Sequence, residues 1–264
     1  MISKKKVALV TGAAGFLGEV FVEAMLDLNY KLVVADKNLK GLSLIEKKIK
    51  KKSKEYFILK LDVTKKKDIE SSFKKIIKRY KKIDILINNA SIDAKPNYKK
   101  NKKKLGFENF SETQWNLEIN TNLKSVFLMS QKIGNYMSKK RSGIILNIGS
   151  DLSVISPTQS IYKIKNNYYK KPITYSVAKH AIVGLTKYLA EYWAKDNVRV
   201  NCLSPGSVNH NQHIALKKQI INLTPIGRLL EKKELKNIIK FLCSEKSRYI
   251  TGQNILIDGG RTII

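Results

Sequence analysis

The stretch KKVALVTGAAGFLGEVF, residues 5–21, joins a short apolar run to three regularly spaced glycines. The run Val7–Val10 has the length and β-branched content of a buried strand, and the apolar pattern that follows the glycines is helical. Gly12, Gly15 and Gly18 therefore fall where a strand turns into a helix. Backbone N–H groups and a helix N-terminus can meet a pyrophosphate there, which favours a dinucleotide-binding fold.

Apolar runs of strand length alternate with segments of helical period along the rest of the chain. Such alternation is typical of βαβ units. The sequence predicts an α/β fold of Rossmann type, a doubly wound parallel sheet with helices on both faces. The expected strands are Val7–Val10, Leu32–Ala35, Tyr56–Leu59, Ile83–Ile87, Gly143–Ile148, Val198–Leu203 and Asn254–Ile257, and the expected helices are Leu17–Leu28, Ile69–Tyr80, Trp115–Met137, Tyr175–Trp193 and Lys232–Leu242.

Length and apolar content bound the class of protein. A chain of 264 residues with 43% hydrophobic residues suits one large core, so we expect a single domain over residues 1–264. The first residues offer only four consecutive apolar side chains, and no later run approaches the roughly 18 that a spanning helix needs. We therefore expect a cytoplasmic protein with no membrane partner.

Cysteine and histidine spacing gives no metal or disulfide framework. Cys202 and Cys243 stand alone, without a CxxC or Cys/His pattern, and are expected to be small buried residues. His210 and His213 have HxxH spacing, but no third ligand is evident. We predict no metal site and expect an exposed or substrate-contacting pair of histidines.

The formal charge of +30 raises the question of a nucleic-acid partner. Only six of the 51 basic residues are arginine, the residue suited to bidentate phosphate contacts. The lysine runs Lys47–Lys54, Lys65–Lys67 and Lys99–Lys104 fall between apolar segments or on polar helix faces, where they are most simply solvated. We expect compositional bias with weak polyanion binding, and no specific nucleic-acid partner.

An acidic residue follows the second expected strand. Asp36 ends the run VVAD, the first strand to follow the helix that opens at the glycines. A carboxylate there hydrogen-bonds the adenosine ribose and repels a 2′-phosphate, which favours NAD(H) over NADP(H). The adjacent Lys37 weakens that repulsion, and an ordinary turn carboxylate is the alternative interpretation.

The segment TYSVAKHAIVGLTKYLA, residues 174–190, carries a pattern suited to proton transfer. Tyr175 and Lys179 are four residues apart and share one helix face. A tyrosine with its pKa near 10 is a poor acid–base group at neutral pH, but a neighbouring ammonium stabilises the phenolate and lowers that pKa. The expected strand GIILNIGS ends at Ser150, whose hydroxyl could hold a substrate oxygen beside the tyrosine.

These motifs occur in an order that resembles the short-chain dehydrogenase/reductase family along nearly the whole chain. They include TGAAGFLG, NNA at Asn88–Ala90, NTNLKSVF at Asn120–Phe127, NIGS at Asn147–Ser150, YSVAK, RVNCLSPG at Arg199–Gly206 and YITGQNILIDGG at Tyr249–Gly260. The resemblance implies an NAD(P)-dependent oxidoreductase that interconverts an alcohol and a carbonyl by hydride transfer. It also implies a homotetramer, with helices 115–137 and 175–193 between subunits.

The resemblance further implies a tetrad of Asn122, Ser150, Tyr175 and Lys179. Tyr175 would exchange the proton, Lys179 would lower its pKa and bind the nicotinamide ribose, Ser150 would orient the substrate, and Asn122 would anchor a water in a proton relay. The positions implied for cofactor contact are Gly12, Ala14, Gly15, Phe16, Leu17, Gly18, Asp36, Lys37, Asp62, Val63, Asn89, Ala90, Tyr175, Lys179, Pro205, Gly206 and Val208.

Three departures from the family pattern stand out. The TGxxGxxG spacing is that of the extended branch, whereas the length, the NNA motif and the DGG ending favour the shorter, single-domain branch, which we expect. Ser91 replaces the glycine of NNAG. The segment between Ser150 and Tyr175 is longer than the family commonly has, so 151–174 is an inserted substrate loop.

The insertion bears on the substrate. Its Tyr162, Tyr168 and Tyr169 and its lysines are expected beside the site, as a lid that recognises an anionic sugar, phosphorylated or nucleotide-linked; a lysine-biased surface loop is the equal alternative. The resemblance implies a second substrate-binding loop over residues 206–226. The insertion, together with the motifs YSVAK, RVNCLSPG, TPIGR and SRYITGQNILIDGG, resembles that of oxidoreductases associated with flagellin modification and nonulosonic-acid sugars. A non-catalytic dinucleotide- or polyanion-binding protein is the competing function, and the tetrad favours the enzyme.

Overall fold

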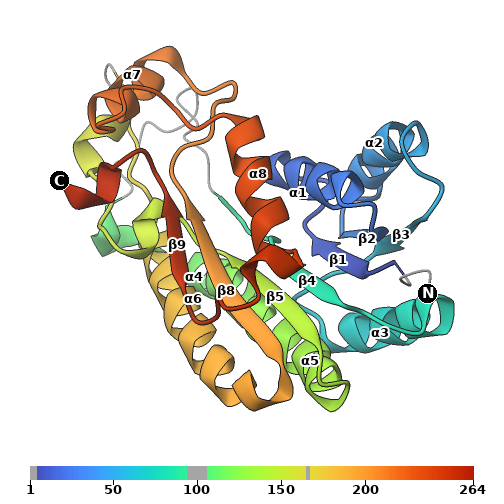
Figure 1. Cartoon of the computed structure of the whole chain (residues 1–264). Coiled ribbons are helices and arrows are strands. Elements are labelled where there is room, and N and C mark those ends of the chain that lie inside the picture. The colour runs from blue at the N-terminus through green and yellow to red at the C-terminus, as the bar shows by residue number, and fades with distance from the viewer. Residues whose placement is uncertain (1–4, 94–105, 165–166) are drawn as a thin grey trace.

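A seven-stranded parallel sheet, in the order β3-β2-β1-β4-β5-β8-β9, forms the centre of the molecule (Figure 1). The computed structural model describes residues 5–93, 106–164 and 167–264, so the lysine run Lys99–Lys104 lies outside it. The predicted fold class is confirmed, and each expected strand is found within two residues of its expected bounds. The strands are β1 (Val7–Thr11), β2 (Lys31–Asp36), β3 (Tyr56–Lys60), β4 (Ile85–Asn88), β5 (Gly143–Ile148), β8 (Val198–Pro205) and β9 (Asn254–Ile257).

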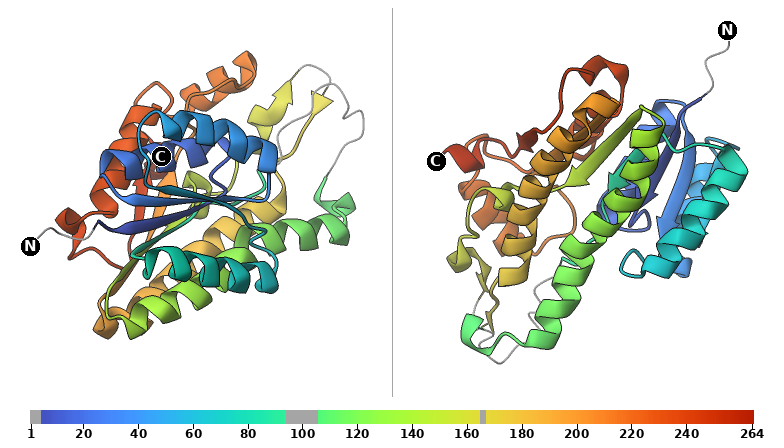
Figure 2. Two further views of the ribbon diagram at one scale, coloured as in Figure 1. Left: turned by 90° about the vertical axis from the view of Figure 1, so that its right-hand side faces the viewer. Right: turned by 90° about the horizontal axis from the view of Figure 1, so that it is seen from below.

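Helices cover both faces of this sheet (Figure 2). Because successive strand residues point to opposite faces, Ala8 and Val10 pack with α1, α2 and α8, whereas Val7 and Leu9 pack with α3, α5 and α6. The helices are α1 (Phe16–Asp27), α2 (Leu39–Lys50), α3 (Lys66–Tyr80), α4 (Glu112–Ile119), α5 (Ser125–Lys139), α6 (Ile173–Tyr192), α7 (Ile214–Asn222) and α8 (Lys232–Leu242).

The structure differs from the expected helices in two places. The single helix expected over 115–137 is interrupted by a π-helical turn, Asn120–Lys124, between α4 and α5. A π turn inserts an extra residue and is frequent at functional sites. Helices α2 and α7 were not predicted; in α2 the buried Leu42, Ile45 and Ile49 have helical spacing, but lysines dominate the same stretch.

Cys202 and Cys243 are buried free thiols, as expected. Across the described ranges, no helix combines the length and apolar content that crossing a bilayer requires.

The glycine turn at the end of β1 is held by close backbone contact. Gly12 has a positive φ of 61°, and a Cβ there would lie 2.6 Å from the Cα of Ala90. A Cβ on Gly18 would overlap the carbonyl oxygen of Gly12, so glycine at 18 lets α1 approach the strand. From the other side, the Asn89 side-chain amide donates to the carbonyl oxygens of Thr11 (3.0 Å) and Gly12 (2.9 Å).

We predict that Gly18→Ala destabilises the protein. The added methyl overlaps backbone that cannot yield easily, and such overpacking costs about 1–3 kcal/mol. Gly184→Ala is the matched control, because Gly184 lies within α6 with no atom near its absent Cβ, and alanine is the better helix former by about 0.5–1 kcal/mol. Urea unfolding would measure both variants, and an unchanged midpoint for Gly18→Ala would contradict the close packing of this turn.

Candidate active site

A cavity of about 620 Å³ opens at the carboxyl ends of the parallel strands, where ligands bind in sheets of this kind. Its lining runs from Asp36 after β2, past the glycine turn, to Tyr175 and Lys179 on α6. The expected cofactor positions that line it are Gly12, Gly15, Phe16, Leu17, Gly18, Asp36, Asn89, Tyr175, Lys179, Pro205, Gly206 and Val208. Those absent from its lining are Ala14, Lys37, Asp62, Val63 and Ala90.

The end of the cavity near Asp36 fits a dinucleotide. The Asp36 carboxylate accepts hydrogen bonds from the backbone N–H groups of Ala14 (3.0 Å) and Asn38 (2.8 Å), which fix it at the edge of the glycine turn. Helix α1 begins after Gly15 without a side-chain cap, so no side chain competes for its first N–H groups. Because the turn has no side chains at Gly12 and Gly15, a phosphate could approach these donors closely.

Two adjacent asparagines at the end of β4 connect this turn to the rest of the site. Asn89 binds the glycine turn, as described above. Asn88 donates to the side-chain oxygen of Asn147 on β5 (2.9 Å), and Asn147 donates to the Thr186 hydroxyl on α6 (2.9 Å). These side chains are buried, and the hydrogen bonds link β4 and β5 to the helix that carries the tyrosine.

Tyr175 and Lys179 lie together, but their ionisation differs from the expected pattern. The Lys179 ammonium is 5.6 Å from the Tyr175 ring centroid and donates to the carbonyl oxygen of Ile148 at 2.7 Å. Burial is the main cause that raises the pKa of Tyr175; the Asp93 charge raises it further and a hydrogen bond with Ser150 lowers it. Burial also lowers the pKa of Lys179 to about 8. In this structure burial therefore outweighs the lowering of the tyrosine pKa that the sequence predicted.

Ser150 is the start of a buried polar chain that the sequence did not reveal. Its hydroxyl donates to Asp151 Oδ1 at 2.7 Å. The other carboxylate oxygen of Asp151 lies 3.0 Å from Nη1 of Arg261, and the two side chains are only 6% and 7% exposed. Each partner directly follows a predicted motif, Asp151 after NIGS and Arg261 after DGG, but the two motifs lie far apart in the chain and no local pattern predicts the pair.

Asn122 lies on the π-helical turn and outside the cavity lining. Its side-chain oxygen accepts from the Ile92 N–H (2.7 Å) and the Ser91 hydroxyl (3.1 Å), and its amide donates to the Ile92 carbonyl (2.9 Å). The side chain therefore fixes the segment after β4. Ser91, the departure from NNAG, does line the cavity.

The insertion and the loop over 206–226 meet in one apolar cluster. Tyr162 and Tyr169 line the cavity, with ring centroids 5.7 Å apart and an edge-to-face tilt of 69°. They pack with Leu216 and Ile220 of α7. The side chain of Tyr168 lies outside the part that the structure describes. A short hairpin, β6 (Lys163–Ile164) with β7 (Asn167–Tyr168), separates the two cavity-lining tyrosines.

Both histidines of the HxxH pattern line the cavity, in separate roles. The His210 ring lies 4.6 Å from the Phe16 ring, which connects the loop to the start of α1. His213 caps α7 by accepting from the Ala215 N–H at 3.3 Å.

Lys171, at the end of the insertion, lies against the tyrosine. Its ammonium is 3.9 Å from the Tyr175 ring centroid and forms an ion pair with Asp93. Lys171 was expected at the site as one of the lid lysines, with Lys163, Lys165 and Lys170, but neither its contact with the Tyr175 ring nor its pairing with Asp93 was predicted. The spacing K-x-x-x-Y-x-x-x-K over 171–179 was the available signal, although 171 precedes the first helical residue.

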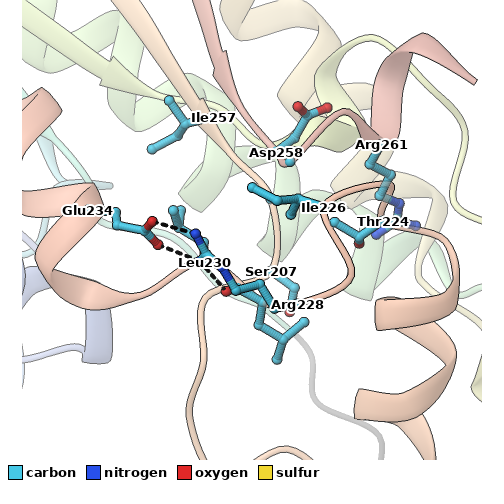
Figure 3. Close-up of a pocket in the computed structure, with 12 residues that line it drawn as sticks. Ser207, Thr224, Ile226, Arg228, Leu230, Glu234, Ile257, Asp258 and Arg261 are labelled. Carbon is cyan, nitrogen blue, oxygen red and sulfur yellow. Dashed lines mark hydrogen bonds and ion pairs between the residues drawn. The ribbon is translucent and has the colours of Figure 1, made fainter.

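A smaller cavity of about 180 Å³ adjoins the site and shares Gly206, Ser207 and Arg261 with it (Figure 3). Arg228 and Glu234 form a two-point ion pair across its wall, at 2.7 and 2.8 Å. No member of the tetrad lines this cavity. The arrangement suited to chemistry therefore lies in the larger one.

Comparisons with known proteins agree with this geometry. A family model described as enoyl-(acyl carrier protein) reductase matches residues 12–262. The chain is 30% identical over 263 residues to 3-oxoacyl-(acyl-carrier-protein) reductase FabG of Thermotoga maritima, covering 98% of each protein. It is 32% identical over 276 residues to an NAD-dependent glycerol dehydrogenase of Listeria innocua, covering 98% of this chain and 94% of the relative. A short-chain dehydrogenase from Leptospira borgpetersenii, solved with bound NAD⁺, superimposes with a TM-score of 0.82 at 32% identity, over 98% of this chain and 93% of that one.

We predict that the stability cost of burying Lys179 falls as the pH rises from about 8 to 10.5. The folded chain releases this proton near pH 8, while the unfolded chain keeps it until its ordinary pKa of 10.5, so the unfolded state binds more protons in that window and unfolding becomes harder. The Lys179→Met variant lacks this titration. Its stability relative to wild type should therefore decline by up to about 1.4 kcal/mol per pH unit across the window.

Denaturant unfolding of both proteins at several pH values from 7 to 10.5 measures this difference. A difference that stays constant over the range would show that the lysine has an ordinary pKa in the folded protein.

Proposed function

The chain belongs to the short-chain dehydrogenase/reductase family of NAD(P)-dependent oxidoreductases, and on that premise we propose that it interconverts an alcohol and a carbonyl with Tyr175 as the acid–base catalyst. One observation carries the proposal. Tyr175, Ser150 and Lys179 line the same cavity as the glycine turn and Asp36, so proton transfer and cofactor binding share one space.

The residues of this chain would hold the dinucleotide along the cavity. The glycine turn and the start of α1 would bind the pyrophosphate, Asp36 the adenosine ribose, and Lys179 the nicotinamide ribose. When bound, the nicotinamide supplies a hydride donor or acceptor. The solved relative with NAD⁺ supports this assignment, as does the relative named for NAD dependence.

The chain's own residues handle the proton. In alcohol oxidation the phenolate of Tyr175 takes the hydroxyl proton, and in carbonyl reduction the phenol returns it. Ser150 would hydrogen-bond the substrate oxygen from the end of β5, which requires its hydroxyl to share or leave Asp151. The Lys179 ammonium would stabilise the phenolate. Asn122 would act through the π turn, by fixing the segment after β4 and by anchoring the relay water there.

The proposed substrate is a hydroxyl-rich, anionic molecule such as a phosphorylated or nucleotide-linked sugar. The insertion 151–174 and the loop 206–226 both contribute to the wall of the cavity, and tyrosine faces suit sugar rings. Lys171 and Arg261 place two cations at the cavity, each paired with a carboxylate, and a substrate anion would compete with Asp93 and Asp151 for them. The glycerol dehydrogenase relative, by its name a polyol enzyme, supports a substrate with several hydroxyls.

We also propose a homotetramer. Apolar side chains on α4, α5 and α6 remain exposed in the single chain, and burial between subunits would remove them from water. They include Leu117, Phe127, Val177 and Tyr192. We further propose that residues 1–264 form a single domain, which would be the unit that associates.

We expect Tyr175→Phe to lower the turnover rate by about 100-fold or more, because the variant loses only the transferable proton. A panel of sugars, polyols and ketones with NAD(H) and NADP(H) would first identify a substrate. The Kd for NAD(H), measured by fluorescence, should remain within about twofold of the wild-type value. Tyr249→Phe, which removes a phenol hydroxyl from a fully exposed position, is the control.

A Tyr175→Phe variant that keeps more than about a tenth of the rate would refute the catalytic role. Cofactor binding without turnover on any panel member would favour the competing function, a non-catalytic dinucleotide-binding protein.

We expect NAD(H) to bind at least about tenfold more tightly than NADP(H), because the Asp36 carboxylate repels a 2′-phosphate. Asp36→Ala should narrow that ratio. Glu112→Ala removes one negative charge from the exposed first turn of α4, outside the cavity, and should leave the ratio unchanged. Equal affinities for the two cofactors in the wild-type protein would contradict the role of this carboxylate.

A further inference from the structure

Lys171 places a second ammonium on the face of the catalytic tyrosine. Its Nζ atom lies 3.9 Å from the Tyr175 ring centroid, closer than the 5.6 Å of Lys179. Both distances are within the range in which a cation is attracted to an aromatic face. The Lys171 side chain is 10% exposed, so water screens its charge only weakly.

The protein holds Lys171 in place at both ends. Its backbone N–H donates to the side-chain oxygen of Gln159 at 2.9 Å, and its carbonyl accepts from the Gln159 amide at 3.2 Å. Its ammonium forms an ion pair with Asp93, from the segment after β4. Gln159 belongs to the insertion, so the added residues position a charge on the site as well as cover it.

The two charges of this pair act on the site in opposite directions. Asp93 raises the pKa of both Tyr175 and Lys179, whereas Lys171 lowers that of Lys179. The other ionisable groups that face the tyrosine are Asp151, which is paired with Arg261, and Tyr162; His210 and His213 line the same cavity.

We propose that Lys171 is a positioning residue for catalysis, which favours the Tyr175 phenolate through its charge, and that Asp93 moderates this effect by pairing with it. The ammonium over the ring stabilises the phenolate more than the neutral phenol, because only the phenolate carries a full negative charge. Asp93 is 54% exposed, so its opposing effect is partly screened. This inference rests on the proposed acid–base role of Tyr175.

The pH dependence of kcat/KM for alcohol oxidation, at saturating NAD, tests the proposal. The substrate would be an uncharged alcohol from the panel, without a group that titrates between pH 5 and pH 11, so that the loss of Lys171 removes no contact with a substrate anion. For Lys171→Met we expect the acid limb to move up by at least about half a pH unit, the shift that Coulomb's law gives for two charges about 5 Å apart in water, because a buried pair is screened less than that. For Asp93→Asn we expect it to move down, because an amide still accepts the hydrogen bond but carries no charge.

On the acid limb, kcat/KM is proportional to the fraction of Tyr175 that is deprotonated, so a comparison of kcat/KM at one pH tests the same shift. There kcat/KM should fall by at least about threefold in Lys171→Met and rise in Asp93→Asn, and for an uncharged alcohol both variants should return to the wild-type value at high pH. The double variant Lys171→Met/Asp93→Asn should lie close to wild type. Lys171→Arg should keep the wild-type profile, as should Lys170→Met, which removes a neighbouring exposed lysine that does not line the cavity.

The alternative is that the Lys171–Asp93 ion pair only holds the insertion against the segment after β4, and it predicts a different result. Lys171→Met and Asp93→Asn would then change the rate in the same direction, and neither would move the pH profile. That outcome, or no change in either variant, would overturn the proposal. If Tyr175→Phe retained its activity, the proposed function itself would fail, and this result is distinct because it does not depend on either partner of the ion pair.

Discussion

The hydrogen bonds of two consecutive asparagines at the end of β4 are the constraint on which the site depends. Asn89 closes the glycine turn by donating to two backbone carbonyls, while Asn88 reaches through Asn147 to Thr186 on α6. Because neighbouring strand residues face opposite ways, one short segment can bind both halves of the cavity. The distance between the cofactor turn and the tyrosine helix is therefore fixed at the centre of the sheet, not by the loops above it.

The strands and the shared helix face of Tyr175 and Lys179 could be predicted because their signals are local. A buried strand in a parallel sheet is a continuous apolar run, and YSVAK places its tyrosine and lysine on one helix face wherever the helix begins. Helix α2 was missed since lysines dominate its stretch and mask the spacing of Leu42, Ile45 and Ile49. The π turn was missed because an expected helix has no signature for one extra residue.

Contacts between distant segments could not be predicted from local pattern. Asp151 pairs with Arg261 near the end of the chain, and Lys171 reaches Asp93 from the far end of the insertion. The same pairs modify the interpretation of the +30 charge: the two cations that face the substrate wall are each matched by a carboxylate. Under the proposed function, an anionic substrate would have to compete with Asp93 and Asp151 for these cations, because the net charge of the two ion pairs is zero.

The shared cluster of Tyr162 and Tyr169 with Leu216 and Ile220 makes the substrate wall a single unit built from two parts of the chain. An exchange of loops between relatives would have to respect this. Grafting the insertion alone onto a shorter relative would expose the tyrosine faces that α7 now covers, and grafting the loop alone would leave α7 without its packing surface. Under the proposed function, substrate specificity would therefore depend on both segments together and would move to another protein only with both.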